Sequence, residues 1–482
     1  MRRIGITLGL LLAACSDPCT AAGVQTQLDG AGVGGVVTLP ACRVEGELTV
    51  PDGVTLRGVP GSELASAAPR DIVVELRAGA ALESVSIDAG GRAAVVMRGD
   101  ASLRDVTVDA RHGVGLYADG GVVTMDGVRV TGPVTPDDAA DPRWIGVLSA
   151  PPESASCPGA SCECEPGAVD EGMGRACAAD GRWLTWASTI GLYARGATLT
   201  LTDVSFEGFT ETGVLTDASQ LTWTRGGVRD VIGVGVLMRG GSSSLTDVTV
   251  ERVVAGLRGV PSYGVIATDG HAMVSDGLTV ADGERFGLLV LGATAANADL
   301  DARGNGDVAV WAGDSSGFSI TGASAVEGNG FAGVVISESS DVTLEGLSVS
   351  MTASVRRSVG AFGVQEIGDG VQVIGPGANV VLRDVTLTGN ARVGLLADVG
   401  PGLAFTNVSV DASGMAFGAL GGTRDVGAGS IRVTNPSGWD SGITRSVTAS
   451  ANDSTASGAF DAIVTALPDG VTGATGIIGP MY

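Results

Sequence analysis

The stretch Leu103-Arg-Asp-Val-Thr-Val108 decides the fold, because close copies of it recur along the chain. One copy is Leu245-Thr-Asp-Val-Thr-Val250, and variants are Leu201-Thr-Asp-Val-Ser-Phe206, Leu382-Arg-Asp-Val-Thr-Leu387 and Phe405-Thr-Asn-Val-Ser-Val410. Apolar residues alternate with Thr, Ser, Asp or Arg in each copy, which is the period of a half-buried β-strand. Self-similarity of this kind indicates a repeat architecture.

A second unit lies between these copies and begins with glycine. Examples are Gly115-Leu-Tyr-Ala-Asp119, Gly191-Leu-Tyr-Ala-Arg195 and Gly213-Val-Leu-Thr-Asp217. Asp203 and Asp247 are 44 residues apart, which is two steps of 22. A repeat of about 22 residues with two or three short strands predicts a coiled parallel sheet, in which each coil buries its apolar face only by stacking on the next.

These repeats resemble those of the right-handed parallel β-helix superfamily, the pectate-lyase-like fold, over nearly all of residues 20–450. The start is similar too: Val24–Leu28, Gly34–Pro40 and Leu48–Gly58 correspond to a capping helix, a first strand and a first coil. The fold class expected is all-β, a single-stranded right-handed parallel β-helix with an N-terminal cap and a Cys-rich loop insertion. The rival all-β folds are a propeller and an antiparallel solenoid, but the period is too short for a four-stranded blade.

Composition excludes several functions. The 482 residues include 29 basic and 53 acidic ones, a net charge of −24, and none of the basic residues is lysine. Nucleic-acid binding needs a basic face, so no nucleic-acid partner is expected. The two histidines, His112 and His271, argue against His-rich zinc or copper sites. We expect an elongated monomer.

The N-terminal sequence predicts export to the bacterial cell envelope. Arg2-Arg3 precedes the apolar stretch 4–12, which is too short to span a bilayer, and Leu12-Ala-Ala-Cys15 resembles a lipobox. The resemblance implies a signal peptide over 1–14, lipidation of Cys15, and a membrane partner through that anchor. Ser16 after the cysteine implies the outer membrane or cell surface. The alternative is an ordinary secretory signal.

Six further cysteines remain, an even number that suits an oxidising compartment. Cys19 and Cys42 bracket the N-terminal element and could pair. The other four lie in one short segment and could form two bridges or, as the alternative, a zinc site, although the usual C-x2-C spacing is missing. These four are Cys157, Cys162, Cys164 and Cys177.

The repeat pattern divides the chain. After the signal peptide we expect an N-terminal cap over 15–47, a first part of the β-helix over 48–134, and a Cys-rich insertion over 135–188. A second part of the β-helix follows over 189–450, and 451–482 is a C-terminal cap or tail.

The insertion is the best candidate for a binding site, because long insertions in solenoids often build the binding face. Trp144, Trp183 and Trp186 flank it, as an aromatic platform for a glycan or partner or as anchors on the rod. Arg111 and His112 are further binding candidates. Arg111-His112-Gly113 comes nearest to the Gly-His-Gly motif of the hydrolases in the superfamily but lacks the first Gly. His112 and His271 are interpreted as surface turn residues rather than catalysts, and no catalytic residue is assigned.

Aspartates recur before one strand of each unit, as Asp105, Asp203, Asp247 and Asp384. A column of carboxylates on adjacent coils could bind Ca²⁺. The favoured interpretation is that each Asp caps a turn through its backbone. No cofactor and no metal site are therefore expected.

Two functions remain open. The first is a non-catalytic surface lipoprotein that binds a polysaccharide or a surface protein along its lateral face. The second is a polysaccharide-active enzyme, a lyase or hydrolase, which should place an Arg beside two or three carboxylates on one lateral face. A copper-delivery role is disfavoured by the two histidines, and fold alone does not decide between scaffold and enzyme.

Overall fold

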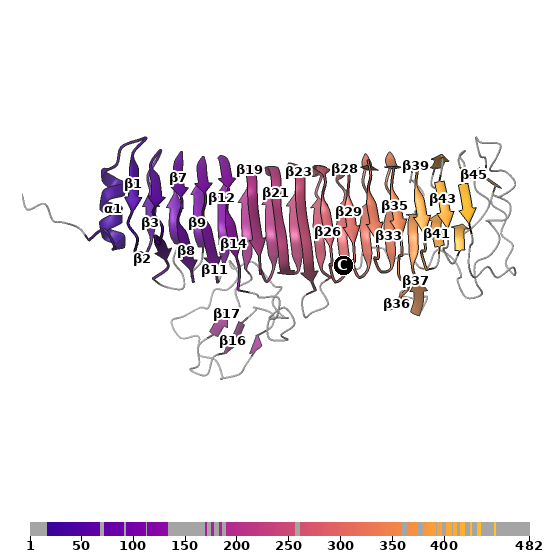
Figure 1. The fold of residues 1–482 in the computed structure, drawn as a ribbon, viewed down its shortest axis with the longest axis horizontal. Coiled ribbons are helices and arrows are strands. Elements are labelled where there is room, and N and C mark those ends of the chain that lie inside the picture. Colours follow the sequence, from indigo (N-terminus) through magenta and orange to yellow (C-terminus); the bar gives the residue numbers. More distant parts are fainter. Residues whose placement is uncertain are drawn as a thin grey trace, which may run out of the picture.

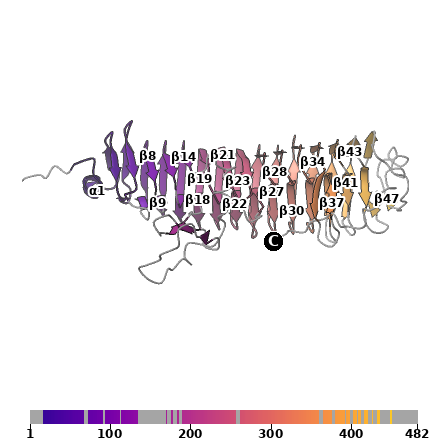
Figure 2. The same ribbon diagram turned by 90° about the horizontal axis from the view of Figure 1, so that it is seen from below.

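The computed structural model describes residues 17–67, 72–90, 93–111, 113–133, 189–255, 261–358, 364–374 and 379–391, and short strands within 169–185 and 393–449. These residues form a right-handed parallel β-helix, which confirms the expected fold class (Figures 1 and 2). The chain passes in turn through three long parallel sheets, called here sheets 1, 2 and 3. Every pairing within them joins strands of neighbouring coils.

Sheet 1 begins at the cap and runs the length of the rod. Its strands are β1 (Val36–Leu39), β4 (Thr55–Gly58), β7 (Ala80–Glu83), β10 (Ala101–Arg104), β13 (Val122–Asp126), β19 (Thr198–Glu207), β21 (Gln220–Ile232), β23 (Ser242–Val254), β25 (Ala272–Asp276), β28 (Thr294–Ala298), β31 (Phe318–Thr321), β34 (Val342–Glu345), β39 (Asn379–Arg383), β42 (Gly402–Thr406), β45 (Asp425–Val426) and β47 (Thr448–Ala449).

Sheet 2 lies one short bend further along each coil and joins sheet 1 through the long strands β19, β21 and β23. Its other strands are β2 (Arg43–Glu45), β5 (Glu63–Ala65), β8 (Ser86–Ala89), β11 (Thr107–Ala110), β14 (Arg129–Thr131), β26 (Thr279–Ala281), β29 (Asp301–Arg303), β32 (Ala325–Glu327), β35 (Ser348–Ser350), β40 (Thr386–Thr388), β43 (Val408–Asp411) and β46 (Ile431–Thr434).

Sheet 3 closes each coil. Its fourteen strands, about 4.8 Å apart, extend over about 60 Å. They are β3 (Leu48–Val50), β6 (Ile72–Leu76), β9 (Ala93–Arg98), β12 (Val114–Asp119), β18 (Ile190–Arg195), β20 (Thr212–Asp217), β22 (Val234–Arg239), β24 (Tyr263–Thr268), β27 (Phe286–Leu291), β30 (Val308–Gly313), β33 (Ala332–Ser337), β38 (Asp369–Ile374), β41 (Val393–Ala397) and β44 (Met415–Ala419).

The apolar positions of the repeat stack directly above one another inside the rod. Along sheet 1, for example, Leu103 pairs with Leu82 on one side and Met125 on the other, and the column continues through Leu201, Trp223 and Leu245. All these side chains are buried in one continuous core. Each coil therefore completes the burial of its neighbours, as the repeat predicts.

The bend between sheets 1 and 2 explains the recurring aspartate. Its first residue has a positive φ in successive coils, a left-handed conformation that favours Gly, Asn and Asp. The predicted aspartates all lie at this bend, and Gly, Ser or Arg takes the same place in other coils. The residues are Ser84, Asp105, Gly127, Asp203, Arg225, Asp247, Gly277, Asp299, Gly322, Gly346 and Asp384.

The bend between sheets 2 and 3 also begins with a left-handed residue, and the next residue points inward. In the three successive coils that contain β19, β21 and β23 this inward residue is apolar: Phe209, Val231 and Val253. Further along, the equivalent positions are Asn305, Asn329, Thr352 and Asn390, all buried. Asn305, Asn329 and Asn390 form what we call the Asn ladder, in which Thr352 takes the place between Asn329 and Asn390.

The N-terminal cap has the helix that the resemblance implied. Helix α1 (Ala21–Gly30) begins at Thr20, whose hydroxyl accepts a hydrogen bond from Gly23 N, and it buries Val24 and Leu28. Gln25 donates to Thr49 O at 3.0 Å and accepts from Thr49 N at 2.9 Å, so it occupies the open edge of β3. Covering an edge in this way prevents further strands from pairing there. A disulfide between Cys19 and Cys42, with Cα atoms 6.0 Å apart, confirms the pairing considered for these cysteines.

The longest departures from the repeat leave the rod at one corner, between sheets 2 and 3. The chain between β14 and β18 includes a small antiparallel sheet of β15 (Val169–Asp170), β16 (Arg175–Cys177) and β17 (Trp183–Thr185). The chain between β35 and β38 forms the hairpin β36 (Val355–Ser358) and β37 (Val364–Ile367). Figure 1 shows both structures along the same long edge of the rod.

Candidate functional site

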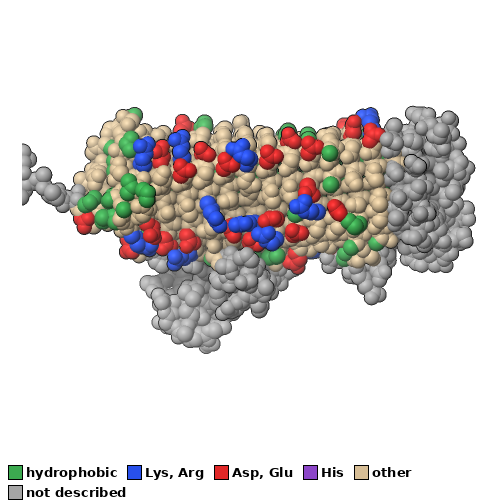
Figure 3. All heavy atoms as spheres, in the orientation of Figure 1, with side chains coloured by type: hydrophobic (Ala, Val, Ile, Leu, Met, Phe, Trp, Pro, Cys, Tyr) green, Lys and Arg blue, Asp and Glu red, His purple; other side chains and the backbone are tan. Residues whose placement is uncertain are grey.

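The aspartate column does not form a continuous run of carboxylates. Asp203 and Asp247 are separated by Arg225, which binds both oxygens of Asp203 at 2.8 and 2.9 Å. This hydrogen-bonded ion pair lowers the pKa of Asp203. Figure 3 shows acidic and arginine side chains interspersed in rows along the rod. Among the described residues there is no group of three or more His, Cys, Asp or Glu side chains that could hold a metal ion.

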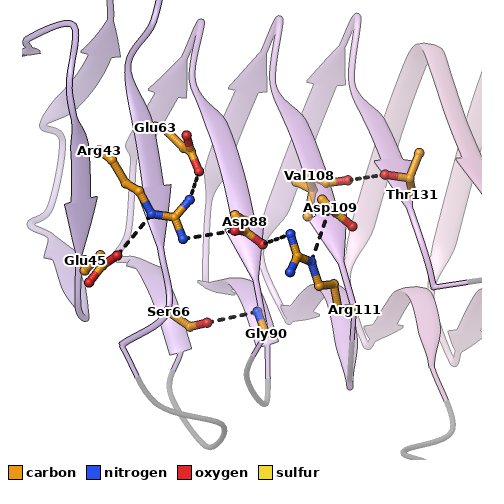
Figure 4. Close-up of polar contacts among 10 residues, drawn as sticks. All are labelled: Arg43, Glu45, Glu63, Ser66, Asp88, Gly90, Val108, Asp109, Arg111 and Thr131. Carbon is orange, nitrogen blue, oxygen red and sulfur yellow. Dashed lines mark hydrogen bonds and ion pairs between the residues drawn. The ribbon is translucent and has the colours of Figure 1, made fainter.

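Arg111, a predicted binding residue, lies in a surface network on sheet 2 (Figure 4). Its guanidinium contacts Asp88 at 3.1 Å and Asp109 at 3.4 Å. Asp88 also contacts Arg43 at 3.0 Å, and Arg43 pairs in turn with Glu45 and Glu63. These pairs join neighbouring coils on an exposed face, where each contributes little stability. The structure thus gives Arg111 carboxylate partners within the rod.

The remaining predicted site residues are outside the described part of the chain or have only their backbone described. Cys15, His112, Trp144, Cys157, Cys162, Cys164 and Trp186 fall outside the described residues, as do segments 1–14 and 451–482. Cys177 and Trp183 lie on β16 and β17, where the backbone alone is described. Their proposed pairing and binding roles stay predictions.

His271 is buried, so its interpretation as a surface turn residue is wrong. It follows the left-handed Asp269 and Gly270 at the bend between sheets 3 and 1, and the ring turns inward. Nδ1 lies 2.5 Å from Gly240 O and must donate to it, so Nε2, 2.9 Å from Ser243 Oγ, accepts. Burial lowers the pKa of His271, although the bond to Gly240 opposes this. Its role is to fill the bend in neutral form.

The outer face of sheet 3 carries an apolar column that the repeat pattern concealed. One outward position in each of nine successive strands is apolar, and tyrosines at two adjacent coils have ring centroids 5.4 Å apart. Burial raises the pKa of Tyr117, one of these tyrosines. The column is Val96, Tyr117, Tyr193, Leu215, Leu237, Ile266, Leu289, Trp311 and Val335.

A small second core forms on this outer face at β27, β30 and β33. It contains Trp311 and Val335 from the column and Phe331 from the bend before β33, and β37 contributes Ile367. Phe286 stacks on Tyr263, with ring centroids 5.2 Å apart and planes inclined by 16°. The hairpin β36–β37 therefore packs against the face of sheet 3.

A pocket opens among these side chains, and we call it the sheet 3 pocket. Its volume is about 10 Å³, room for about one water molecule. Its wall combines aromatic rings with one basic, one acidic and one amide side chain. The lining residues are Arg285, Phe286, Asp307, Val308, Trp311, Phe331, Val335 and Gln372.

The polar side chains of the pocket are buried or partly buried, and they make hydrogen bonds. Arg285 Nε donates to Asp307 Oδ2 at 2.5 Å, and the guanidinium lies 5.3 Å from the centre of the Phe286 ring. Asp307 is 3% exposed. Trp311 Nε1 donates to Ser337 Oγ at 2.9 Å. A largely buried ion pair beside aromatic rings and a hydrogen-bonded indole makes this pocket a candidate binding site.

Sequence reasoning missed this pocket. Arg285, Asp307 and Gln372 are 87 residues apart at the extremes and come together only because of the register of β27, β30, β33 and β38. A local signal did exist, since Phe286 and Trp311 are two of few aromatic residues in the chain and lie on neighbouring strands. No described helix is long and apolar enough to cross a membrane.

Comparison with known proteins adds solved structures of the same architecture. No family model and no curated protein matches the chain. The A-module of a mannuronan C-5 epimerase from Azotobacter vinelandii is 14% identical, with 90% of this chain and 96% of that chain covered and a TM-score of 0.39. Tailspike protein 3 of bacteriophage CBA120 is 9% identical over 80% and 58% of the two chains (TM-score 0.44), and a polygalacturonase from Erwinia carotovora is 13% identical over 81% and 92% (TM-score 0.27). At these identities the likeness concerns architecture alone.

Proposed function

We propose that this protein is an exported, lipid-anchored rod that binds a polysaccharide along the outer face of sheet 3 without transforming it. The observation that carries the proposal is the sheet 3 pocket, where aromatic rings and buried polar groups converge on one lateral face. Apolar walls with a few fixed polar groups are typical of ligand sites.

The sheet 3 pocket has room for about one water molecule. A sugar chain would lie across the face and place single groups in the pocket. The carboxylate of Asp307 is held by Arg285, and that of Asp369 accepts a hydrogen bond from Gln372 at 2.8 Å.

A second candidate function, a polysaccharide lyase or hydrolase, is favoured by one specific observation. Arg285 lies beside a carboxylate on a lateral face, which is part of the arrangement that the enzyme hypothesis requires. The purified mature chain should be incubated with neutral and acidic polysaccharides, scoring both binding and the release of unsaturated or reducing ends. Binding without product supports the scaffold; product that disappears in Asp307→Asn, while binding persists, replaces it with the enzyme.

The anchor is the other part of the proposal. Cys15 lies four residues before Cys19, whose disulfide to Cys42 joins this end of the chain to the first coil. A lipid on Cys15 would therefore attach the membrane to a covalently fastened end of the rod. In a bacterial host, labelled fatty acid should enter the wild-type protein and not Cys15→Ser; equal labelling of both would contradict the anchor.

A further inference from the structure

One buried amide interrupts the apolar column of sheet 3. After nine apolar members the next position in register is Gln372, which pairs with Val335 and is followed by Leu396. Gln372 is fully buried and lines the sheet 3 pocket. An uncharged polar side chain has no packing advantage in such a column, so its hydrogen bonds matter.

One hydrogen bond of Gln372 fixes which end of the amide lacks a partner. Its Nε2 lies 2.8 Å from Asp369 Oδ2, and because a carboxylate accepts there, the nitrogen must be on that side. The oxygen, Oε1, has no hydrogen-bond partner among the described residues. A buried acceptor of this kind requires a donor.

The pocket has room for one donor group of small size. Its volume suits a water molecule or a single hydroxyl. The rings of Trp311 and Phe331 form part of the wall, so the carbon skeleton of a sugar can pack against apolar surface while one hydroxyl enters.

The charges around the pocket disfavour an acidic ligand. Arg285, the one basic residue in the lining, is already bound to Asp307, and Asp369 holds the amide of Gln372. A ligand carboxylate would meet the acceptor Oε1 and these buried carboxylates. The net charge of −24 also repels a polyanion at long range.

We propose that Gln372 Oε1 accepts a hydrogen bond from one hydroxyl of a neutral polysaccharide, so that the protein selects neutral sugars over uronates. This inference rests on the proposed function and specifies its ligand class. Gln372 acts as the residue that determines this specificity.

The test uses the full mature chain and calorimetry with neutral six-sugar oligosaccharides of glucose, galactose and mannose, and with the oligogalacturonate of the same length. We expect at least one neutral oligosaccharide to bind and the uronate to bind more weakly at low salt. Gln372→Met keeps the volume and removes the acceptor, and should weaken neutral binding about tenfold. Gln220→Met, on the exposed side of β21 in sheet 1, is the matched control and should change nothing.

The outcomes separate this inference from the proposed function. Tighter binding of the uronate than of every neutral oligosaccharide, or equal affinities for wild type and Gln372→Met, overturns the inference and leaves polysaccharide binding standing. If none of the oligosaccharides binds, the proposed function fails and the inference fails with it.

A crystal structure supplies a readout independent of affinity. Without sugar, we expect an ordered water within hydrogen-bond distance of Gln372 Oε1, and in a complex a sugar hydroxyl at the same point. A protein donor on Oε1, or a sugar bound with the water still in place, overturns the inference.

Discussion

The bend between sheets 2 and 3 is built in two ways along the same rod. In the three successive coils that contain β19, β21 and β23, Phe209, Val231 and Val253 fill it with apolar side chains. In later coils, the Asn ladder fills it with amides that bond between coils: Asn329 Oδ1 accepts from Asn305 N at 2.9 Å and from Asn305 Nδ2 at 3.0 Å. The same backbone geometry therefore accommodates an apolar side chain or an amide, but an amide stabilises the bend only where neighbouring coils supply its hydrogen-bond partners.

The position of the ladder is informative. Asn305 directly precedes the pair Gly306-Asp307, which leads into β30, and Asn329 lies two residues before Phe331. The ladder thus fixes the backbone that carries the sheet 3 pocket. Hydrogen bonds define a geometry more narrowly than apolar contacts do, and positioning of this kind suits a binding site.

The largest effect is expected from removing a central amide of the ladder. Asn329→Leu deprives Asn305 N of its acceptor and leaves Ala302 O and Glu327 O without the donor that Asn329 Nδ2 provides at 2.9 and 3.1 Å. With several buried groups unsatisfied, we expect a loss of about 4 kcal/mol. Chemical denaturation and hydrogen exchange at the Asn305 amide measure it. Asn379→Leu, at an exposed position of sheet 1, is the control.

Introducing an amide at an apolar position of this bend tests whether hydrogen-bond partners decide which side chain is stable there. Val231→Asn places an amide between the apolar neighbours Phe209 and Val253, and should cost about 3 kcal/mol because the buried amide finds too few partners. Denaturation of this variant beside wild type gives the value. A variant as stable as wild type would show that the apolar and amide versions of this bend are interchangeable.

The disulfide at the cap distinguishes the two ends of the rod. Replacing Cys19 and Cys42 by serine opens a loop with a sequence separation of 23 and should cost about 3 kcal/mol. Because each coil contacts only its neighbours, hydrogen exchange should accelerate in β1–β6 and stay unchanged at the Asn ladder. Uniform acceleration along the rod would mean that it unfolds as one unit.

A smaller effect is expected at the left-handed bend between sheets 1 and 2. Asp105→Val places a β-branched residue at φ 51° and should cost about 1–2 kcal/mol. Asp105→Gly should be close to neutral, since Gly127 takes this place in the next coil. Thermal unfolding of the pair isolates the backbone contribution, and equal stabilities would show that the bend tolerates any side chain.

The smallest effect is a pH dependence near the middle of the rod. Because burial lowers the pKa of His271, the unfolded chain binds a proton more readily than the folded one. The stability due to neutral His271 is complete above its ordinary pKa of about 6.5 and falls as the pH drops below that value. Unfolding followed from pH 7.5 to 5 should show this loss in wild type and less of it in His271→Gln; parallel curves would contradict it.

Much of the fold could be predicted from the sequence, because the apolar alternation and the spacing of 22 are local properties. The Cys19–Cys42 pair and the capping helix could also be predicted. The sequence held a signal for the Asn ladder, since Gly-Asn recurs at 304–305, 328–329 and 389–390. The pocket could not be predicted, because its register depends on connections of irregular length, such as the sequence separation of 37 between the paired Val335 and Gln372.

The insertion with β15–β17 and the hairpin β36–β37 leave the rod at one corner of the coil, while the described turns at the other two corners are short. Additions to this scaffold therefore need no change in the stacking of the rod, and they arrive beside the face that holds the pocket. Evolution can therefore change what the protein recognises by exchanging the insertions at this corner while the β-helix stays the same.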